Sequence, residues 1–216
     1  MQLLKTRDFA ISLLTGAVLF VASYIIMSRA VTYATESASN SVTDIVLSNT
    51  AVYNVGGIFV WGVVVLALAA LAACLMKPER IPFVLKSSAL FMLIRSSFIS
   101  LTHISPDPLK VIIDPNIVTY LVPSFFMGDD LFFSGHTGFP FLLALIFWDN
   151  VVLRLVFLGF SILFGVVVLL GHLHYSIDVA SAFFIAFTIF MIAKTLFKRD
   201  WARGSAQPQV LTDKVQ

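Results

Sequence analysis

The sequence predicts an all-α, polytopic membrane protein with six transmembrane helices in one bundle. Its 216 residues are 59% hydrophobic and only 12% charged, whereas a soluble domain is about 45–50% apolar and about 25% charged. The apolar residues gather in long runs, and the mean hydropathy is +0.95. The length fits a single membrane domain over residues 1–216. A net charge of +2 is too small to suggest a nucleic-acid partner.

A membrane-spanning helix needs about 20 mostly apolar residues, and six stretches meet or approach that length. They lie at about Phe9–Ser28, Tyr53–Met76, Ile81–Leu101, Phe132–Trp148, Val151–Leu170 and Ile177–Phe197. The first run is longer than the apolar segment of about 7–15 residues in a signal peptide, so we expect a retained helix. Residues 200–216 are expected to form a polar tail.

The positive charges predict the orientation of these helices. One side of the topology holds eleven of the 14 Lys and Arg residues: Lys5, Arg7, Lys77, Arg80, Lys86, Arg154, Lys194, Lys198, Arg199, Arg203 and Lys214. The positive-inside rule places that side, and both termini, in the cytoplasm. Lys86 would then lie low in the third helix and extend its ammonium group to the cytoplasmic surface.

Two short motifs carry the candidate chemistry. Ser134-Gly135-His136-Thr137 opens the fourth predicted helix, and His172-Leu173-His174-Tyr175-Ser176-Ile177-Asp178 joins the fifth to the sixth. Both fall on the non-cytoplasmic side, as does Arg95. Ionisable groups at a membrane edge are functional candidates because they are costly to keep there.

The spacing within the second motif predicts a paired imidazole and carboxylate. His174 and Asp178 are four residues apart, which makes them neighbours on one face of a helix. Asp178 would then fix the tautomer of His174 and raise its basicity, while His136 would supply a proton. Such a nucleophile and proton donor fit phosphoryl transfer through a covalent intermediate. The alternative is a hydrogen-bonded pair with a purely structural role.

These motifs resemble the sphingomyelin synthase-like branch of the type-2 phosphatidic acid phosphatase superfamily. That branch has Gly-Asp-x-x-x-Ser-Gly-His-Thr and His-Tyr-Thr-x-Asp-Val stretches and six membrane helices. The segment that begins at Arg95 is similar to its Arg-x-x-Thr segment, and Thr43-Asp44 is weakly similar to its Pro-Asp motif. The resemblance covers roughly residues 40 to 197.

The resemblance implies a role for each site residue. His174 would form a phosphohistidine, Asp178 would orient it, and His136 would act as general acid and then as general base. Ser134, Gly135 and the nearby backbone would hold phosphate oxygens. Arg95 would contact the phosphate, and its alternative is an arginine that only reaches the membrane surface. His172 would be a supporting donor or a solvated loop residue.

Asp129 and Asp130 lie beside Phe125, Phe126, Phe132 and Phe133. Acids and aromatic faces together can hold a quaternary amine, so this cluster is a candidate site for a choline or ethanolamine head group. Alternatively, the two acids favour the N-terminus of the fourth helix, where negative charge is stabilising.

The departures from the superfamily's phosphatases favour a diester substrate. Those phosphatases have Lys-x6-Arg-Pro, and Ser-Arg before the second histidine, where this chain has Val167 and Val168. A phosphomonoester or diphosphate carries more charge than a diester and needs such cations. Since these cationic motifs are missing, Arg95, helped by His172 or Lys110, would bind the single negative charge of an intact phospholipid.

The predicted function is therefore head-group transfer or hydrolysis on a membrane phospholipid, either sphingomyelin synthase-like or phospholipase C-like. A ceramide-like alcohol, diacylglycerol or water would be the acceptor. The alternatives are a lipid phosphatase acting on phosphatidate, phosphatidylglycerophosphate or a polyprenyl diphosphate, and a non-catalytic lipid-binding or transport protein. No cofactor and no metal are expected, because a third ligand at suitable spacing is missing. The short tails suit a bacterial inner membrane with a periplasmic site, and a Golgi or plasma membrane is the alternative.

Overall fold

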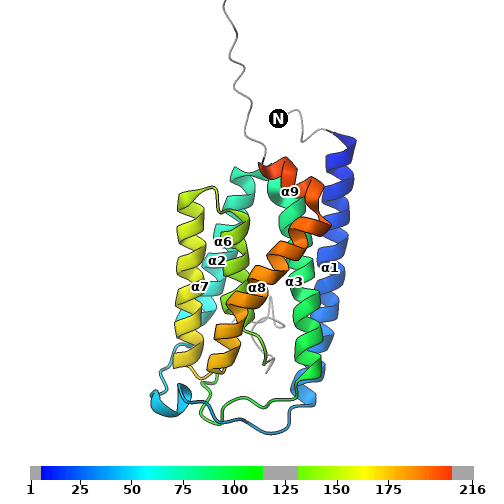
Figure 1. The fold of residues 1–216 in the computed structure, drawn as a ribbon. Coiled ribbons are helices and arrows are strands. Elements are labelled where there is room, and N and C mark those ends of the chain that lie inside the picture. The colour runs from blue at the N-terminus through cyan, green and yellow to red at the C-terminus, as the bar shows by residue number, and fades with distance from the viewer. Residues whose placement is uncertain (1–5, 114–130, 206–216) are drawn as a thin grey trace, which may run out of the picture.

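The computed structural model describes residues 6–113 and 131–205, and this part of the chain is helical without any strand. The predicted all-α class is thus confirmed (Figure 1). The helices are α1 (Arg7–Glu36), α2 (Gly56–Met76), α3 (Ile81–Leu101), α6 (Gly135–Ile146), α7 (Val151–Leu170), α8 (Ser176–Leu196) and α9 (Lys198–Ser205), with short 3₁₀ turns η2 (Leu47–Asn49) and η3 (Pro78–Arg80).

Five of the helices, with η3 leading into α3, are long and apolar enough to cross a membrane, where the sequence predicted six. The difference is α6, which has 12 residues and so a length of only about 18 Å, against a hydrocarbon core of about 30 Å. Its beginning is fixed by Ser134, whose side chain accepts a hydrogen bond from the Thr137 amide, and Phe147 ends it. The predicted helix over residues 132–148 is therefore shorter at both ends.

The first helix is longer than predicted, because it continues from Ser28 to Glu36. Its last turns bury Ala30, Val31 and Ala34 against Ile99 of α3. This packing stabilises a helical extension that apolar run length alone does not detect.

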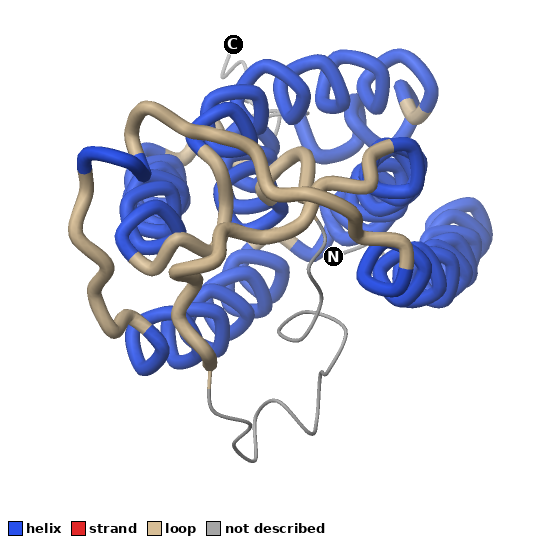
Figure 2. The backbone as a smooth tube through the Cα atoms, turned by 90° about the horizontal axis from the view of Figure 1, so that it is seen from below, coloured by secondary structure: helices blue, strands red, loops and turns tan. Residues whose placement is uncertain are grey.

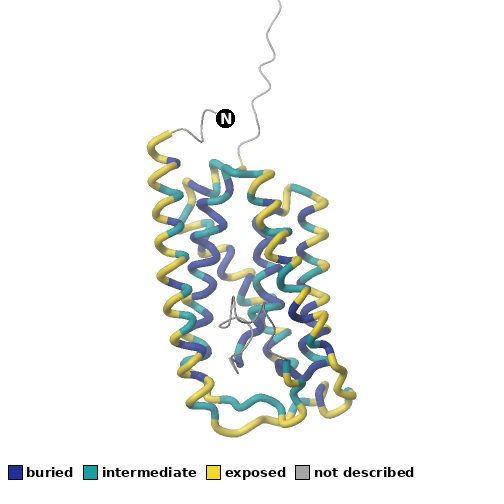
Figure 3. Tube along the Cα trace, turned by 180° about the vertical axis from the view of Figure 1, so that it is seen from behind, coloured by how far each residue is buried: buried dark blue, intermediate teal, exposed yellow. Residues whose placement is uncertain are grey.

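The short helix α6 lies in the centre of the bundle. Leu142, Leu143, Ala144 and Ile146 are all 0% exposed, so apolar side chains cover it on every side. It packs against α7, α8 and α3, while α1 packs along α3 and α2 along α7. Buried positions line the inside of the bundle and exposed ones the outside (Figure 3). Many outward side chains are large and apolar, such as Leu14, Leu68 and Val152, which fits helices surrounded by lipid.

One end of the bundle, which we call the terminal end, holds the start of α1 and the helix α9 (Figure 1). Here Lys86 donates to Asp200 at 2.7 Å and to Ser12 at 2.6 Å. Lys86 is only 8% exposed, so the prediction that its ammonium group reaches the membrane surface is wrong. The reason is that residues 198–205, which include the first six residues of the predicted polar tail, fold into α9 and place Asp200 over the lysine.

Replacing Lys86 with Met should lower the free energy of unfolding by about 3 kcal/mol, because Asp200 is left buried without its main cation. Chemical unfolding in detergent micelles measures this loss. The matched control is Lys77→Met, since the Lys77–Asp149 pair is more exposed and such pairs contribute about 1 kcal/mol or less. Joint replacement of Lys86 and Asp200 by Met and Leu should restore most of the loss, and equal losses in the two single variants would contradict the prediction.

Candidate active site

Two histidines face each other at the opposite end of the bundle, which we call the site end. His136 is the second residue of α6, and His174 lies in the turn before α8. Their ring centroids are 6.4 Å apart, with an angle of 53° between the rings. Phe59 and Phe164 flank the His136 ring at centroid distances of 4.5 and 6.0 Å. The rings are close enough for one phosphate group to contact both.

Asp178 fixes His174. Its Oδ2 atom lies 3.2 Å from His174 Nδ1 and also accepts the Tyr175 amide at 3.1 Å. His174 precedes the helix, so the two side chains meet around the helix start rather than along one helical face. The Asp178 Oδ1 atom is buried and has no hydrogen-bond partner in the part of the chain that the structure describes. An unsatisfied buried carboxylate oxygen disfavours folding, and a functional site is one place where such an atom is kept.

The first turn of α6 is tied to α8. The Ser134 amide donates to the Asp178 carbonyl at 3.0 Å. The Ser134 hydroxyl accepts hydrogen bonds from the Thr137 amide at 3.4 Å and from the Thr137 hydroxyl at 3.2 Å. This backbone hydrogen bond therefore joins the start of α6, which carries His136, to the start of α8, which carries Asp178. The N-terminus of α6 also presents its amides beside His136, an arrangement that favours an anion.

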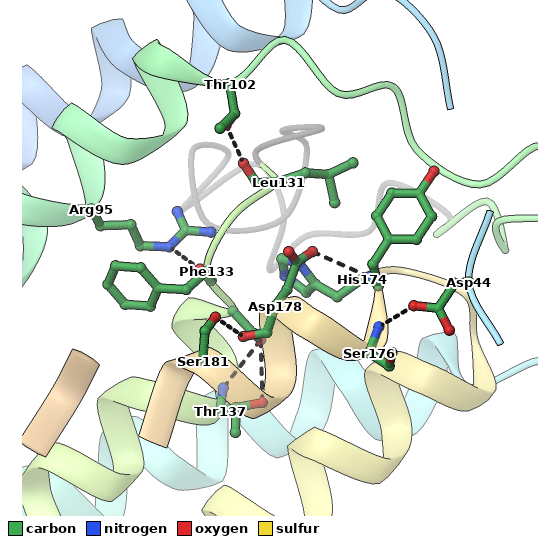
Figure 4. Close-up of polar contacts among 12 residues, drawn as sticks. Asp44, Arg95, Thr102, Leu131, Phe133, Thr137, His174, Ser176, Asp178 and Ser181 are labelled. Carbon is green, nitrogen blue, oxygen red and sulfur yellow. Dashed lines mark hydrogen bonds and ion pairs between the residues drawn. The ribbon is translucent and has the colours of Figure 1, made fainter. Parts of the chain in front are cut away.

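Arg95 is buried and belongs to the site end of α3. Its Nε donates to the Phe133 carbonyl at 2.9 Å, and nearby the Thr102 hydroxyl donates to the Leu131 carbonyl at 3.1 Å (Figure 4). These two hydrogen bonds attach the segment before α6 to α3 and to its C-cap residue. Gly135 lies directly under the guanidinium group, because a Cβ atom there would be 3.0 Å from Arg95 Nε. The arginine is 3% exposed and does not extend to the surface.

His172 contacts the two connections that cross the site end. Its Nε2 lies 3.2 Å from the Thr50 carbonyl, and its Nδ1 lies 3.3 Å from Asp107 Oδ1 without hydrogen-bond geometry. The residue is 2% exposed and has φ of 53°, in the left-handed region. These contacts position the turn that carries His174.

Asp44 is a part of the site that the sequence indicated only weakly. Its Oδ2 accepts the Ser176 amide at 2.6 Å, and its Oδ1 accepts the amides of Val46 and Leu47 at 2.8 and 3.1 Å. Burial alone would raise the pKa of this carboxyl, but the hydrogen bonds from Ser176, Leu47 and Val46 outweigh burial and hold the pKa below its ordinary value. Thr43-Asp44 was the only sequence signal for this contact.

Acidification should remove the contribution of Asp44 to stability. Because the pKa of Asp44 is lower in the folded state, its contribution is complete above the ordinary value of 3.8 and is lost as the pH falls through the lowered pKa. Thermal unfolding midpoints between about pH 3 and 6 should therefore fall more steeply for the wild type than for Asp44→Asn. Parallel curves for the two proteins would show that this carboxylate does not titrate with folding.

Some predicted site residues lie outside the described part of the chain: Asp129 and Asp130, with Phe125 and Phe126. Within residues 6–113 and 131–205, the structure contains no group of three His, Cys, Asp or Glu side chains that could hold a metal ion.

Comparison with known families adds to this geometry. Residues 128–195 match the family described as PAP2 superfamily C-terminal. This match supports the type-2 phosphatidic acid phosphatase superfamily. The matched range includes His136, His174 and Asp178, and Asp44 and Arg95 precede it. Members of the superfamily are phosphoesterases, which supports an enzyme acting on lipid phosphate esters. No curated protein and no solved structure matches the chain.

Proposed function

We propose that the protein transfers or hydrolyses the phosphorylated head group of a membrane phospholipid through a phosphohistidine at His174. The observation that carries the proposal is the facing pair of imidazoles, with ring centroids 6.4 Å apart and with Asp178 on His174. The match to the PAP2 superfamily supports phosphoester chemistry at this pair.

The reaction would run in two displacements at phosphorus. In the first, a ring nitrogen of His174 bonds to phosphorus, the bond to the diacylglycerol oxygen breaks, and His136 gives that oxygen a proton. In the second, His136 takes the proton of an incoming hydroxyl, whose oxygen bonds to phosphorus while the bond to His174 breaks. Ser134, Gly135 and Arg95 would stabilise the charge on the remaining phosphate oxygens.

The charge around the site supports a diester substrate. The positions that carry Ser-Arg in the superfamily's phosphatases are Val167 and Val168, which are 3% and 0% exposed and belong to the apolar core. Within the described residues, the Arg95 guanidinium donates to the segment before α6, at the Phe133 carbonyl. One arginine suits the single negative charge of a diester better than the greater charge of a monoester or diphosphate.

The identity of the acceptor decides whether the proposed enzyme is a transferase or a phospholipase C. A ceramide-like alcohol or diacylglycerol would make the enzyme sphingomyelin synthase-like, and water would make it hydrolytic. A head-group site at Asp129 and Asp130 stays a prediction. The distribution of Lys and Arg supports a site on the non-cytoplasmic side, and we propose that this side is the periplasm of a bacterial inner membrane.

Lipid mass spectrometry on the purified protein tests the proposal. Mixed phospholipids are supplied with and without ceramide, beside a His174→Ala control. Diacylglycerol should form in both conditions if water is the acceptor, and only with ceramide if a ceramide-like alcohol is the acceptor. The His174→Ala variant should form none. Phosphatidate consumption with release of inorganic phosphate, and no reaction on diesters, would instead make the protein a lipid phosphatase. Retained lipid binding without any turnover would favour a binding or transport protein.

A further inference from the structure

The connection between α1 and α2 crosses the site end (Figures 1 and 2), and through Asp44 it reaches the start of α8. There the Asp44 carboxylate meets the Ser176 amide at 2.6 Å, although the two residues are 132 positions apart. Ser176 lies midway between His174 and Asp178, two residues from each. A displacement of the Ser176 amide therefore also displaces the backbone of His174 and Asp178.

Helix α8 needs a carboxylate from elsewhere because of its own sequence. The first amides of a helix have no partner within it, and an N-cap Ser, Thr, Asp or Asn often provides one. Here the N-cap is Tyr175, whose side chain makes no capping hydrogen bond. Asp178 accepts the Tyr175 amide and Asp44 accepts the Ser176 amide. Two carboxylates, one local and one distant, thus fix successive amides.

The other half of Asp44 is itself held in place. Its second oxygen accepts two amides of its own turn, and Leu47 in that turn is 3% exposed and packs against Tyr175 and Leu131. The Tyr175 hydroxyl donates to the Ser105 carbonyl at 2.9 Å and accepts the Val42 amide at 3.2 Å. The connection therefore holds the turn before α8 at three points: the Val42 amide on the Tyr175 hydroxyl, the apolar contact of Leu47 with Tyr175, and the Asp44 carboxylate on the Ser176 amide.

We propose that Asp44 is a positioning residue for the reaction: it holds the first turn of α8 so that His174 stays aligned between Asp178 and His136. This inference rests on the proposed function, because it assumes that His174 reacts with phosphorus. A misplacement of about 1 Å can reduce a rate about 100-fold. The loss of the 2.6 Å bond should therefore appear in kcat rather than in substrate binding.

Two variants of Asp44 separate the contacts of its carboxylate. Asn keeps one oxygen acceptor and replaces the other with a donor, so it can satisfy either Ser176 or the Val46–Leu47 turn but not both. Ala satisfies neither. We expect kcat to fall about tenfold in Asp44→Asn and about 100-fold in Asp44→Ala, with KM within about threefold of the wild type. The matched control is Glu36→Gln, an exposed carboxylate at the C-terminal end of α1, which should keep the wild-type kcat.

Rates are taken per folded molecule, well below the unfolding temperature, and hydrogen exchange of a peptide covering residues 171–180 is measured in parallel. The proposal predicts faster exchange in this peptide together with the fall in kcat. A wild-type kcat in Asp44→Ala, or a loss that only follows the amount of unfolded protein, overturns it. If the wild type itself shows no turnover that depends on His174, the proposed function fails, and the positioning role falls with it.

Discussion

Replacing His174 with Ala should lower kcat by roughly 10,000-fold or more, because no other group can form the covalent intermediate. Replacing His136 with Ala should have a different signature. With a natural lipid, both displacements lose their proton donor or acceptor and slow by roughly 100- to 10,000-fold. With an aryl phosphodiester, whose leaving group needs no proton, the first displacement continues while the second stalls. The phosphorylated protein should then accumulate.

A labelled head group measures this difference. Label should remain on denatured His136→Ala in base and be released in acid, as a phosphorus–nitrogen bond requires, and His174→Ala should carry none. The control is His103→Ala, an exposed histidine at the same end of the bundle that packs edge-to-face against Tyr33, for which we expect less than about a threefold change. Label retained by His174→Ala would give the nucleophile to another residue. Absence of label in both variants, with turnover in the wild type, would indicate direct attack by water.

The sequence was sufficient for the parts of the fold that depend on local patterns. Long apolar runs predicted the five long helices, and the Ser-Gly-His and His-x-x-x-Asp motifs identified residues that the structure brings together. His136 lies in α6 and His174 in the turn before α8, yet run lengths alone placed them at one end of the bundle. This works because a membrane-spanning helix has a nearly fixed length, so the position along a run gives the depth.

The contacts between distant segments could not be predicted in this way. Lys86 and Asp200 are 114 positions apart, and neither neighbourhood has a pattern that marks a pair. Without Asp200 above it, a lysine near a helix end is expected to extend to the surface. Asp44 was missed as a site residue for the same reason, since its partner is a backbone amide that any residue would supply. The length of α6 depended on the Ser134 cap, which apolarity does not reveal.

Replacing Asp178 with Asn should lower kcat by roughly 100- to 10,000-fold while the fold stays intact. Both hydrogen bonds of this carboxylate, from His174 Nδ1 and from the Tyr175 amide, go to the same oxygen, Oδ2. An Asn oxygen in that place can accept both, so the backbone cap of α8 is kept. What is lost is the negative charge that stabilises His174 when it becomes cationic on bonding to phosphorus, and the certainty of its tautomer.

The measurement compares kcat, KM and the unfolding midpoint of Asp178→Asn with those of Ser181→Ala. The Ser181 hydroxyl donates to the Asp178 carbonyl at 3.3 Å, and so Ser181→Ala controls for disturbance of the same helical turn. A large fall in kcat with an unchanged midpoint assigns Asp178 to the chemistry. A fall in stability with an unchanged kcat would make Asp178 a helix cap and nothing more. That outcome would also leave the unpartnered Oδ1 without an explanation, because a cap uses only the oxygen that accepts the amide.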